Sequence, residues 1–402
     1  MPPRFSDSPN ARSKSITTAE LDTHGVLNRH STKHPVFQVG VSEDKGSRRT
    51  MEDAHSFVVD FDNIRGQGFF AVFDGHAGKH AAEWCGAHFH ESLLTALRAS
   101  PGVPVPDILN ETFHNVDESL SRMCEESDGK IHSGCTAVTA FLRIEDADGQ
   151  QDFLPSPEGS PDPEQSSDSA SSPHNSSSEN VTPPPSDDAK DTKKKKDSKS
   201  SSASRIKQAL KSFGTSSISN LISPPTPRSL SPAGSRKNSA DGLNIAIPPA
   251  SSRRVLYCAN AGDARGVLCR AGKAVRLTYD HKGSDKQEAK RITDAGGFVM
   301  SGRVNGVLAV TRSLGDSSMK EFVVGAPYTT ETALCEDDEF LILACDGLWD
   351  VVGDQGAVDL VRGIQDAQVA SRKLLDHALS HHTTDNVTVL VIRFKHGPSS
   401  PA

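Results

Sequence analysis

Residues 69–76 read FFAVFDGH, an apolar run that ends in an acidic residue, a glycine and a histidine. An apolar run of this length, rich in phenylalanine and valine, is typical of a buried strand. The layout recurs as FLILACDG at residues 340–347, and DNVTVLVI at residues 385–392 places its acidic residue before the strand. Asp74, Asp346 and Asp385 are therefore expected at the rim of a core, where an unpaired charge is costly and a cation is the natural partner.

Further acidic residues precede another apolar run. Glu52 and Asp53 come directly before a strand predicted near Ala54 to Asp60. Carboxylates gathered in this way indicate a site for a hard divalent cation with oxygen ligands, and such sites most often serve hydrolysis or transfer of phosphate esters. Gly75 lets other atoms approach the backbone closely and could offer its carbonyl oxygen to a cation. Taken alone, the Asp74–Gly75 pair is equally compatible with an ordinary turn.

Two basic side chains lie close in sequence to these carboxylates. A histidine can protonate a leaving oxygen near neutral pH, and His76 lies two residues beyond Asp74. Arg48 precedes Glu52 and could bind a phosphate through two parallel hydrogen bonds. Without a neighbouring metal site, His76 could equally be a structural histidine on the surface, and Arg48 could be an ordinary solvated cation.

Composition limits the class of protein. The chain has 402 residues and a formal net charge of -8, which gives no reason to expect a nucleic-acid partner. No apolar run approaches the roughly 18 residues that a membrane span needs. The seven cysteines are scattered without a C-x-x-C pair, which is typical of reduced thiols. Residues 1–5 lack the pattern of a secretory signal. We therefore expect a monomer in the cytoplasm, the nucleus or both, with no membrane partner.

The composition changes along the chain and predicts one interrupted domain. Residues 1–34 are polar and predict a disordered arm, residues 35–396 form the domain, and residues 397–402 form a disordered tail. Residues 146–252 are rich in Ser, Pro and Lys and cannot bury enough apolar surface to offset the entropy of ordering, so they predict a disordered insertion. This insertion would interrupt a hairpin whose strands end at Ile144 and resume at Val255.

Apolar periodicity predicts the helices. One begins near Lys79, a second runs from Val105 to Met123, and two more lie near residues 357–364 and 369–378. Ser284 followed by Gln287 has the spacing of a capping box, which predicts a helix that starts there and ends at Ala295.

Several other phosphate and hydrolase chemistries lack their motifs. The chain has no G-x-x-x-x-G-K-[ST] loop and no cysteine followed six positions later by arginine. It also has no G-x-S-x-G, and its Cys and His spacings do not match zinc sites. A P-loop, a cysteine-nucleophile phosphatase, the usual hydrolase elbow and a zinc site are all unsupported.

Eight segments of the chain resemble the metal-dependent serine/threonine protein phosphatases of type 2C. They occur in the family's order and cover the chain from about Phe37 to Phe394 apart from the insertion. The matching segments are residues 48–53 (RRTMED), 70–78 (FAVFDGHAG), 133–137 (SGCTA), 259–265 (ANAGDAR), 277–282 (LTYDHK), 303–316 (RVNGVLAVTRSLGD), 343–350 (LACDGLWD) and 384–388 (TDNVT).

The resemblance implies a fold and a cofactor. The fold would be α+β, a four-layer α-β-β-α sandwich of two antiparallel sheets flanked by helices. A pair of Mn²⁺ or Mg²⁺ ions would lie in a cleft at one end of the sandwich, with a weaker third ion nearby.

The resemblance also implies a role for each site residue. Asp74 would bridge both ions, the Gly75 carbonyl would bind one of them, and Asp346 and Asp385 would complete the other. Asp53 and Glu52 would act at the metals, partly through bound water. The remaining roles are phosphate binding for Arg48, protonation of the leaving alkoxide for His76, and ligation of the third ion for Asp263 and Asp350.

The function implied is hydrolysis of phosphoserine and phosphothreonine in proteins by a water activated by two metal ions. Phosphorylated proteins would be the substrates, and kinases of a stress-activated pathway would be partners by analogy with related phosphatases. Two alternatives stay open: a non-catalytic scaffold or binding protein on the same fold, and a metal-dependent phosphatase of small molecules. A scaffold would be expected to lack one or more of Asp74, Asp346 and Asp385.

Overall fold

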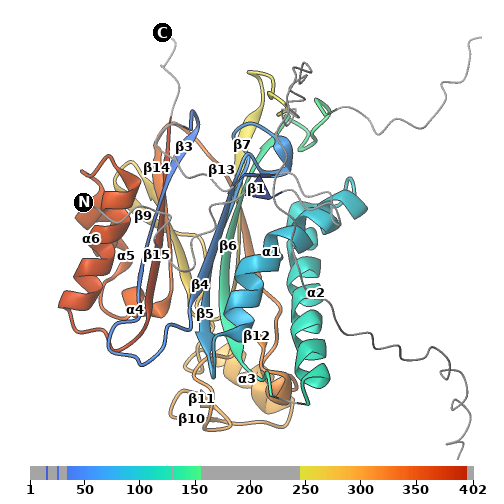
Figure 1. Cartoon of the computed structure of the whole chain (residues 1–402), viewed down its shortest axis with the longest axis vertical. Helices are drawn as coiled ribbons and strands as arrows, with labels where there is room; N and C mark the ends of the chain where they lie inside the picture. The colour runs from blue at the N-terminus through green and yellow to red at the C-terminus, as the bar shows by residue number, and fades with distance from the viewer. Residues whose placement is uncertain (1–14, 17–24, 27–33, 129, 155–244, 396–402) are drawn as a thin grey trace, which may run out of the picture. The chain divides into compact units, whose positions relative to one another are not determined.

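The computed structural model describes residues 15–16, 25–26, 34–128, 130–154 and 245–395. Within them, two antiparallel sheets pack face to face and helices cover both outer faces (Figure 1). Residues 155–244, most of the predicted insertion, lie outside the described part, as do most of the predicted arm and the tail at 397–402.

The first sheet has eight strands. In spatial order these are β1 (Ser15–Ile16), β2 (Gly25–Val26), β4 (Ala54–Val59), β5 (Gly68–His76), β6 (Gly134–Glu145), β7 (Arg253–Ala261) and β13 (Tyr328–Ala333), and β12 (Leu314–Gly315) pairs with β6. Helices α1 (His80–Ala99) and α2 (Val105–Glu126) cover its outer face.

The second sheet has five strands. Their order is β3 (Phe37–Asp44), β15 (Val387–Phe394), β14 (Asp338–Ala344), β8 (Arg265–Arg270) and β9 (Lys273–Arg276). Helices α4 (Asp346–Trp349), α5 (Asp354–Val361) and α6 (Ala367–Ser380) cover its outer face. The short elements are η3 (Phe61–Asn63), α3 (Lys286–Asp294), the hairpin of β10 (Val299–Met300) and β11 (Arg303–Val304), and η4 (Ser317–Met319).

The side chains of β5 point alternately to the two faces of its sheet and so contribute to two apolar layers. Successive side chains of a strand point to opposite faces of its sheet. Phe69 and Phe73 pack against Phe89 of α1, whereas Phe70 and Val72 pack between the two sheets. A further apolar layer lies between the second sheet and its helices. The predicted α+β sandwich of four layers is confirmed.

Strands β6 and β7 form the hairpin that was predicted across the insertion. They pair antiparallel, with Ile144 opposite Arg254. The flanks of residues 155–244 also contact the domain. The Ala246 amide donates to the Asn63 carbonyl at 2.7 Å, and the Ala246 carbonyl accepts from the Arg65 amide at 2.9 Å.

The predicted helix start at Ser284 is wrong by one residue. Asp285 is the N-cap of α3, and its carboxylate accepts from the amides of Gln287 and Glu288. Serine and aspartate both cap helices well, so adjacent residues of these types leave the start ambiguous in the sequence.

No helix in the described part of the chain is long and apolar enough to cross a bilayer.

Candidate metal centre

The pairing of strands gathers the predicted carboxylates at one end of the sandwich. Asp53 directly precedes β4, and Ala54 lies opposite Phe73 of β5, so the start of β4 lies beside Asp74. In the second sheet Asp346 follows β14 after Cys345 and is the first residue of α4, and Asp385 lies two residues before β15. Because β14 and β15 are antiparallel, these two residues also lie at a shared sheet edge.

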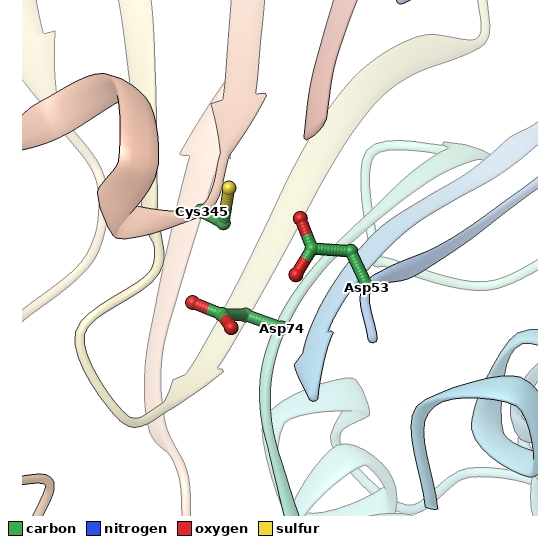
Figure 2. A group of neighbouring side chains, drawn as sticks. All are labelled: Asp53, Asp74 and Cys345. Atoms are coloured by element: carbon green, nitrogen blue, oxygen red, sulfur yellow. The ribbon is translucent and has the colours of Figure 1, made fainter. Parts of the chain in front are cut away.

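Asp53 and Asp74 converge on Cys345, and Figure 2 shows the three side chains turned toward a common space. One possible ligand atom from each residue lies within 4.8 Å of the others. Sequence reasoning named the two carboxylates but missed the thiol, although Cys345 is the last apolar residue before Asp346. Burial first, and then the nearby carboxylates, raise the Cys345 pKa well above its usual value. Cys345 is therefore a neutral thiol here, and the charged donors of this group are oxygens.

The cluster is short of positive charge. Burial, followed by repulsion from Asp53, Asp346, Asp263 and Asp385, raises the Asp74 pKa well above its usual value. Burial is also the main cause that raises the pKa of Asp53 to about 6 and that of Asp346 to about 8. Carboxylates that are costly to ionise together are stabilised by a hard cation, so these residues fit Mg²⁺ or Mn²⁺.

Two glycines allow the backbone to close around the cluster. A Cβ on Gly75 would lie 2.1 Å from the Glu52 carbonyl oxygen, and a Cβ on Gly347 would lie 2.0 Å from the Asn386 carbonyl oxygen. Neither position has room for a side chain. The Glu52 amide donates to Asn386 Oδ1 at 2.8 Å, which joins the residues before β4 to those before β15.

Arg48 lies against one of the predicted metal ligands. Its Nη2 is 2.6 Å from Asp385 Oδ2, and its Nε donates to the Thr384 carbonyl at 3.3 Å. The guanidinium is about half exposed. It therefore stands at the mouth of the cluster, where a phosphate could reach it.

His76 has a partner that sequence reasoning missed. Its Nε2 lies 2.7 Å from Asp316 Oδ2, across 240 residues of sequence. Asp316 is the last residue of the matching segment RVNGVLAVTRSLGD, and this motif is the feature of the sequence that could have pointed to it.

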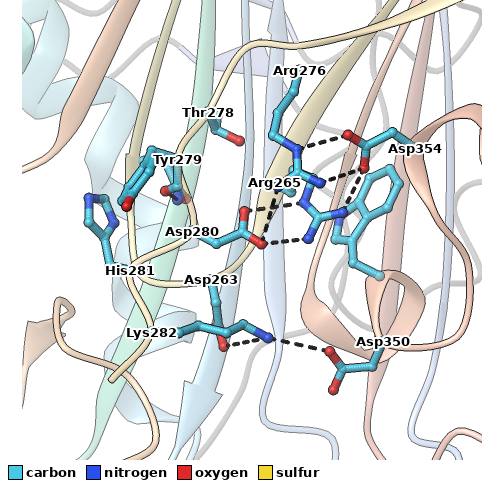
Figure 3. A network of polar contacts seen from close by, with 12 residues as sticks. Asp263, Arg265, Arg276, Thr278, Tyr279, Asp280, His281, Lys282, Asp350 and Asp354 are labelled. Atoms are coloured by element: carbon cyan, nitrogen blue, oxygen red, sulfur yellow. Dashed lines mark hydrogen bonds and ion pairs between the residues drawn. The ribbon is translucent and has the colours of Figure 1, made fainter. Parts of the chain in front are cut away.

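The two residues assigned to a third ion hold a lysine between them. Figure 3 shows Lys282 between Asp263 and Asp350, and its Nζ lies 3.4 Å from a carboxylate oxygen of each. Burial alone would lower the Lys282 pKa, but the two carboxylates outweigh it and raise the pKa. Lys282, which sequence reasoning did not assign to the site, therefore supplies a positive charge beside the cluster.

A second network in Figure 3 braces the same end of the second sheet. Arg265 contacts Asp280 and Asp354, at 2.5 Å and 2.6 Å, and Arg276 contacts Asp354 at 2.8 Å. The Arg265 guanidinium also lies 5.1 Å from the ring centre of Trp349, two positions from Gly347. These contacts hold α4 and α5 against the strand that follows Asp263.

The model of the family described as Protein phosphatase 2C matches residues 37–147 and 181–387. The chain belongs to the protein phosphatase 2C family. It is 36% identical over 370 residues to Protein phosphatase 2C homolog 1 of Saccharomyces cerevisiae, covering 91% of this chain and 97% of that protein. It is 34% identical over 380 residues to the Schizosaccharomyces pombe protein of the same description, covering 94% and 79%. The chain is thus a protein serine/threonine phosphatase of a metal-dependent hydrolase family.

Solved structures agree with the phosphatase 2C fold. The chain resembles a serine-threonine phosphatase 2C from Toxoplasma gondii with a TM-score of 0.56, at 17% identity and covering 91% of this chain and 97% of that one. A sex-determining protein of C. elegans has a TM-score of 0.57, at 21% identity and covering 89% and 64%. At such identities these structures support the fold alone.

Proposed function

We propose that this phosphatase 2C holds two Mg²⁺ or Mn²⁺ ions between its two sheets and uses them to hydrolyse phosphoserine and phosphothreonine. The ligands would be Asp53, Asp74, the Gly75 carbonyl, Asp346 and Asp385, with Glu52 acting through water. The observation that carries the proposal is the gathering of these carboxylates at one end of the sandwich, where Asp53 and Asp74 lie side by side. Burial first, and then repulsion between carboxylates, raise the pKa values of Asp74 and Asp346. When bound, the ions would lower the pKa of a water and neutralise charge on the phosphoryl oxygens.

The chain's own basic residues would handle the substrate. Arg48 stands half exposed beside Asp385 and can direct its remaining donors at a phosphate. His76 would donate a proton to the leaving serine or threonine oxygen, which is a poor leaving group unless protonated.

A third ion would bind more weakly than the first two. Its proposed ligands Asp263 and Asp350 already share the Lys282 ammonium, so a cation must displace that charge. The Asp350 side chain is also well exposed, which leaves it hydrated in competition with the ion.

The test of this proposal is turnover of a phosphoserine or phosphothreonine peptide with Mn²⁺ or Mg²⁺, followed by excess chelator. We expect turnover with either ion, its loss with chelator, and much slower turnover of phosphorylated metabolites. Faster turnover of metabolites would favour a small-molecule phosphatase. Absence of turnover with both ions would favour a scaffold.

We extend the proposal to kinases of a stress-activated pathway as substrates, in the cytoplasm, the nucleus or both. The support is the analogy with related phosphatases. Incubation of the phosphatase with phosphorylated stress-activated kinases and with unrelated phosphoproteins would compare their rates, and equal rates would contradict the extension.

A further inference from the structure

The Asp316 carboxylate and the His76 imidazole are hydrogen-bonded beside the carboxylate cluster. Asp316 Oδ2 lies 2.7 Å from His76 Nε2, and the Asp316 side chain is 9% exposed. Burial acts to raise the Asp316 pKa, but the hydrogen bonds and charge of His76 and the Ser313 hydroxyl lower it overall. Asp316 is therefore an ionised acceptor, which requires that His76 carry a hydrogen on Nε2.

The surrounding backbone is built to hold this pair. Asp316 has a φ of 49°, in the left-handed region that non-glycine residues seldom adopt and that is found more often at functional sites. A Cβ on Gly134 would lie 2.3 Å from Asp316 Oδ2 and 2.5 Å from His76 Nε2, so the pair fits only beside a glycine. The Ser313 hydroxyl donates to the same carboxylate oxygen, Asp316 Oδ2.

We infer that Asp316 is a positioning residue that accepts the Nε2 hydrogen of His76 and fixes its ring. The doubly protonated imidazole would then deliver its Nδ1 proton to the leaving oxygen and be left as the neutral Nε2–H tautomer. Within the described contacts, the Asp316 carboxylate binds the opposite edge of the imidazole and leaves Nδ1 for the substrate. A carboxylate that orients a histidine in one tautomer is a known way to align proton transfer. This inference rests on the proposed role of His76 as the proton donor.

The kinetic test compares Asp316→Asn with wild type on a phosphoserine peptide and on an aryl phosphate, whose leaving group needs little protonation. We expect Asp316→Asn to lower kcat on the peptide by about 10-fold or more, with KM nearly unchanged. Turnover of the aryl phosphate should change much less. The loss on the peptide should stay below the roughly 100 to 10,000-fold contribution of a general acid, because His76 itself is still present. Equal losses on both substrates would overturn the inference.

A matched control separates positioning from loop stability. Asp117 holds the same loop, because its Oδ1 accepts from the Gly315 amide at 2.9 Å and contacts Lys320 Nζ at 2.7 Å. Asp117→Ala removes the acceptor of the Gly315 amide, so it should lower the melting temperature without changing the ratio of peptide to aryl phosphate turnover. A change of that ratio equal to the one in Asp316→Asn would overturn the inference, because a loosened loop would then explain both.

Two further variants keep the test decisive if Asp316→Asn folds poorly. Gly134→Ala should push the two flexible side-chain ends apart and produce the same selective loss on the peptide. In a His76→Ala background, Asp316→Asn should cause no further loss on the peptide, since it acts only through the ring. A full, independent loss in that background would contradict positioning.

A readout that needs no activity distinguishes this inference from the proposed function. Nitrogen-15 NMR of the imidazoles in metal-free protein should show His76 with its hydrogen on Nε2, and Asp316→Asn should shift that signal. An unchanged His76 signal would overturn the inference even if the phosphatase were active. A clear shift in a protein without turnover would support the pair and count against the proposed function instead.

Discussion

Ionisation of each carboxylate in the cluster costs free energy, and a bound metal ion would offset that cost. Asp53 and Asp74 are held together by β4 and β5, and Asp346 is brought to them from the other sheet. In the metal-free protein, burial first and then mutual repulsion raise the pKa values of these carboxylates above those of exposed carboxylates.

Replacement of a single ligand should separate catalysis from stability. We expect Asp74→Asn or Asp346→Asn to lower turnover by about 100-fold or more, because metal-assisted catalysis is worth several kcal/mol. The same variants should melt at a higher temperature than wild type when both are measured with chelator, because one repelling charge is gone. The assay is peptide turnover with Mn²⁺ together with calorimetry.

The control for this pair is Asp376→Asn. Asp376 is an exposed carboxylate of α6 that pairs with Arg372, so its loss should change neither quantity by much. Wild-type turnover in Asp74→Asn, at saturating Mn²⁺, would show that the cluster does not hold the catalytic ions.

At the scale of the elements, close backbone contacts set the spacing of the cluster. The Glu52 carbonyl packs on Gly75 of β5, and the Asn386 carbonyl packs on Gly347 of α4. Both contacts join residues that are distant in sequence. The absence of a side chain at each glycine therefore sets the short distance between the two segments that meet there.

Gly75→Ala should therefore force β5 away from the residues before β4. The atom in the way is a backbone carbonyl, which cannot rotate aside, so we expect a loss of about 1 to 3 kcal/mol in unfolding free energy and loss of most activity. Gly363→Ala is the control, because nothing lies within 4 Å of its Cβ position. Denaturant unfolding measures both variants, and equal stability of the two would contradict this account of Gly75.

The insertion connects β6 to β7, and two deletions of different length within it should differ in their effect on stability. A deletion of residues 155–244, joined by a flexible Gly-Ser linker, should preserve turnover and melting temperature because no proposed ligand lies in that range. A longer deletion of residues 147–252 also removes the Ala246 and Gln151 contacts. It should keep turnover but lower the unfolding free energy by about 2 to 6 kcal/mol, at about 0.5 to 1.5 kcal/mol for each of these four hydrogen bonds.

Turnover and thermal melting of the two deletions against the full chain provide the measurement. A collapse of turnover in the shorter deletion, with an unchanged melting profile, would show that residues 155–244 contribute to the active site.

For the whole molecule, the cluster links stability to pH and to metal. The pKa values of Asp53 and Asp346, about 6 and about 8, are higher in the folded protein than the usual value of 3.8. A group whose pKa is raised by folding binds its proton more tightly in the folded state, so it stabilises most below the unfolded pKa and loses that contribution as pH rises through the folded pKa.

The metal-free phosphatase should therefore lose stability between about pH 4 and pH 8, at about 1.4 kcal/mol for each unit by which folding raises a pKa. Saturating Mg²⁺ should reduce this decline, because metal ions replace the protons and bind more tightly as the carboxylates ionise. Urea unfolding with chelator and with Mg²⁺ tests this. Asp346→Asn should flatten the metal-free slope, and an unchanged slope would mean that other groups cause it.

The sequence by itself determined the elements and most of the cluster. Strand alternation and the placement of Asp74, Asp346 and Asp385 beside apolar runs are local features, because they depend on residues within one element. They predicted the strands and the need for a cation, and the order of motifs predicted the four-layer fold.

Only the tertiary structure decided the partners of these residues. The pairing of His76 with Asp316, the bond from Arg48 to Asp385 and the lysine between Asp263 and Asp350 each join separate elements. Side-chain type and spacing along the chain cannot specify such pairs, because the distance between them is fixed by how two sheets and their loops pack. The charges of the site were therefore visible in the sequence, whereas the contacts that orient and balance them arose only from the fold.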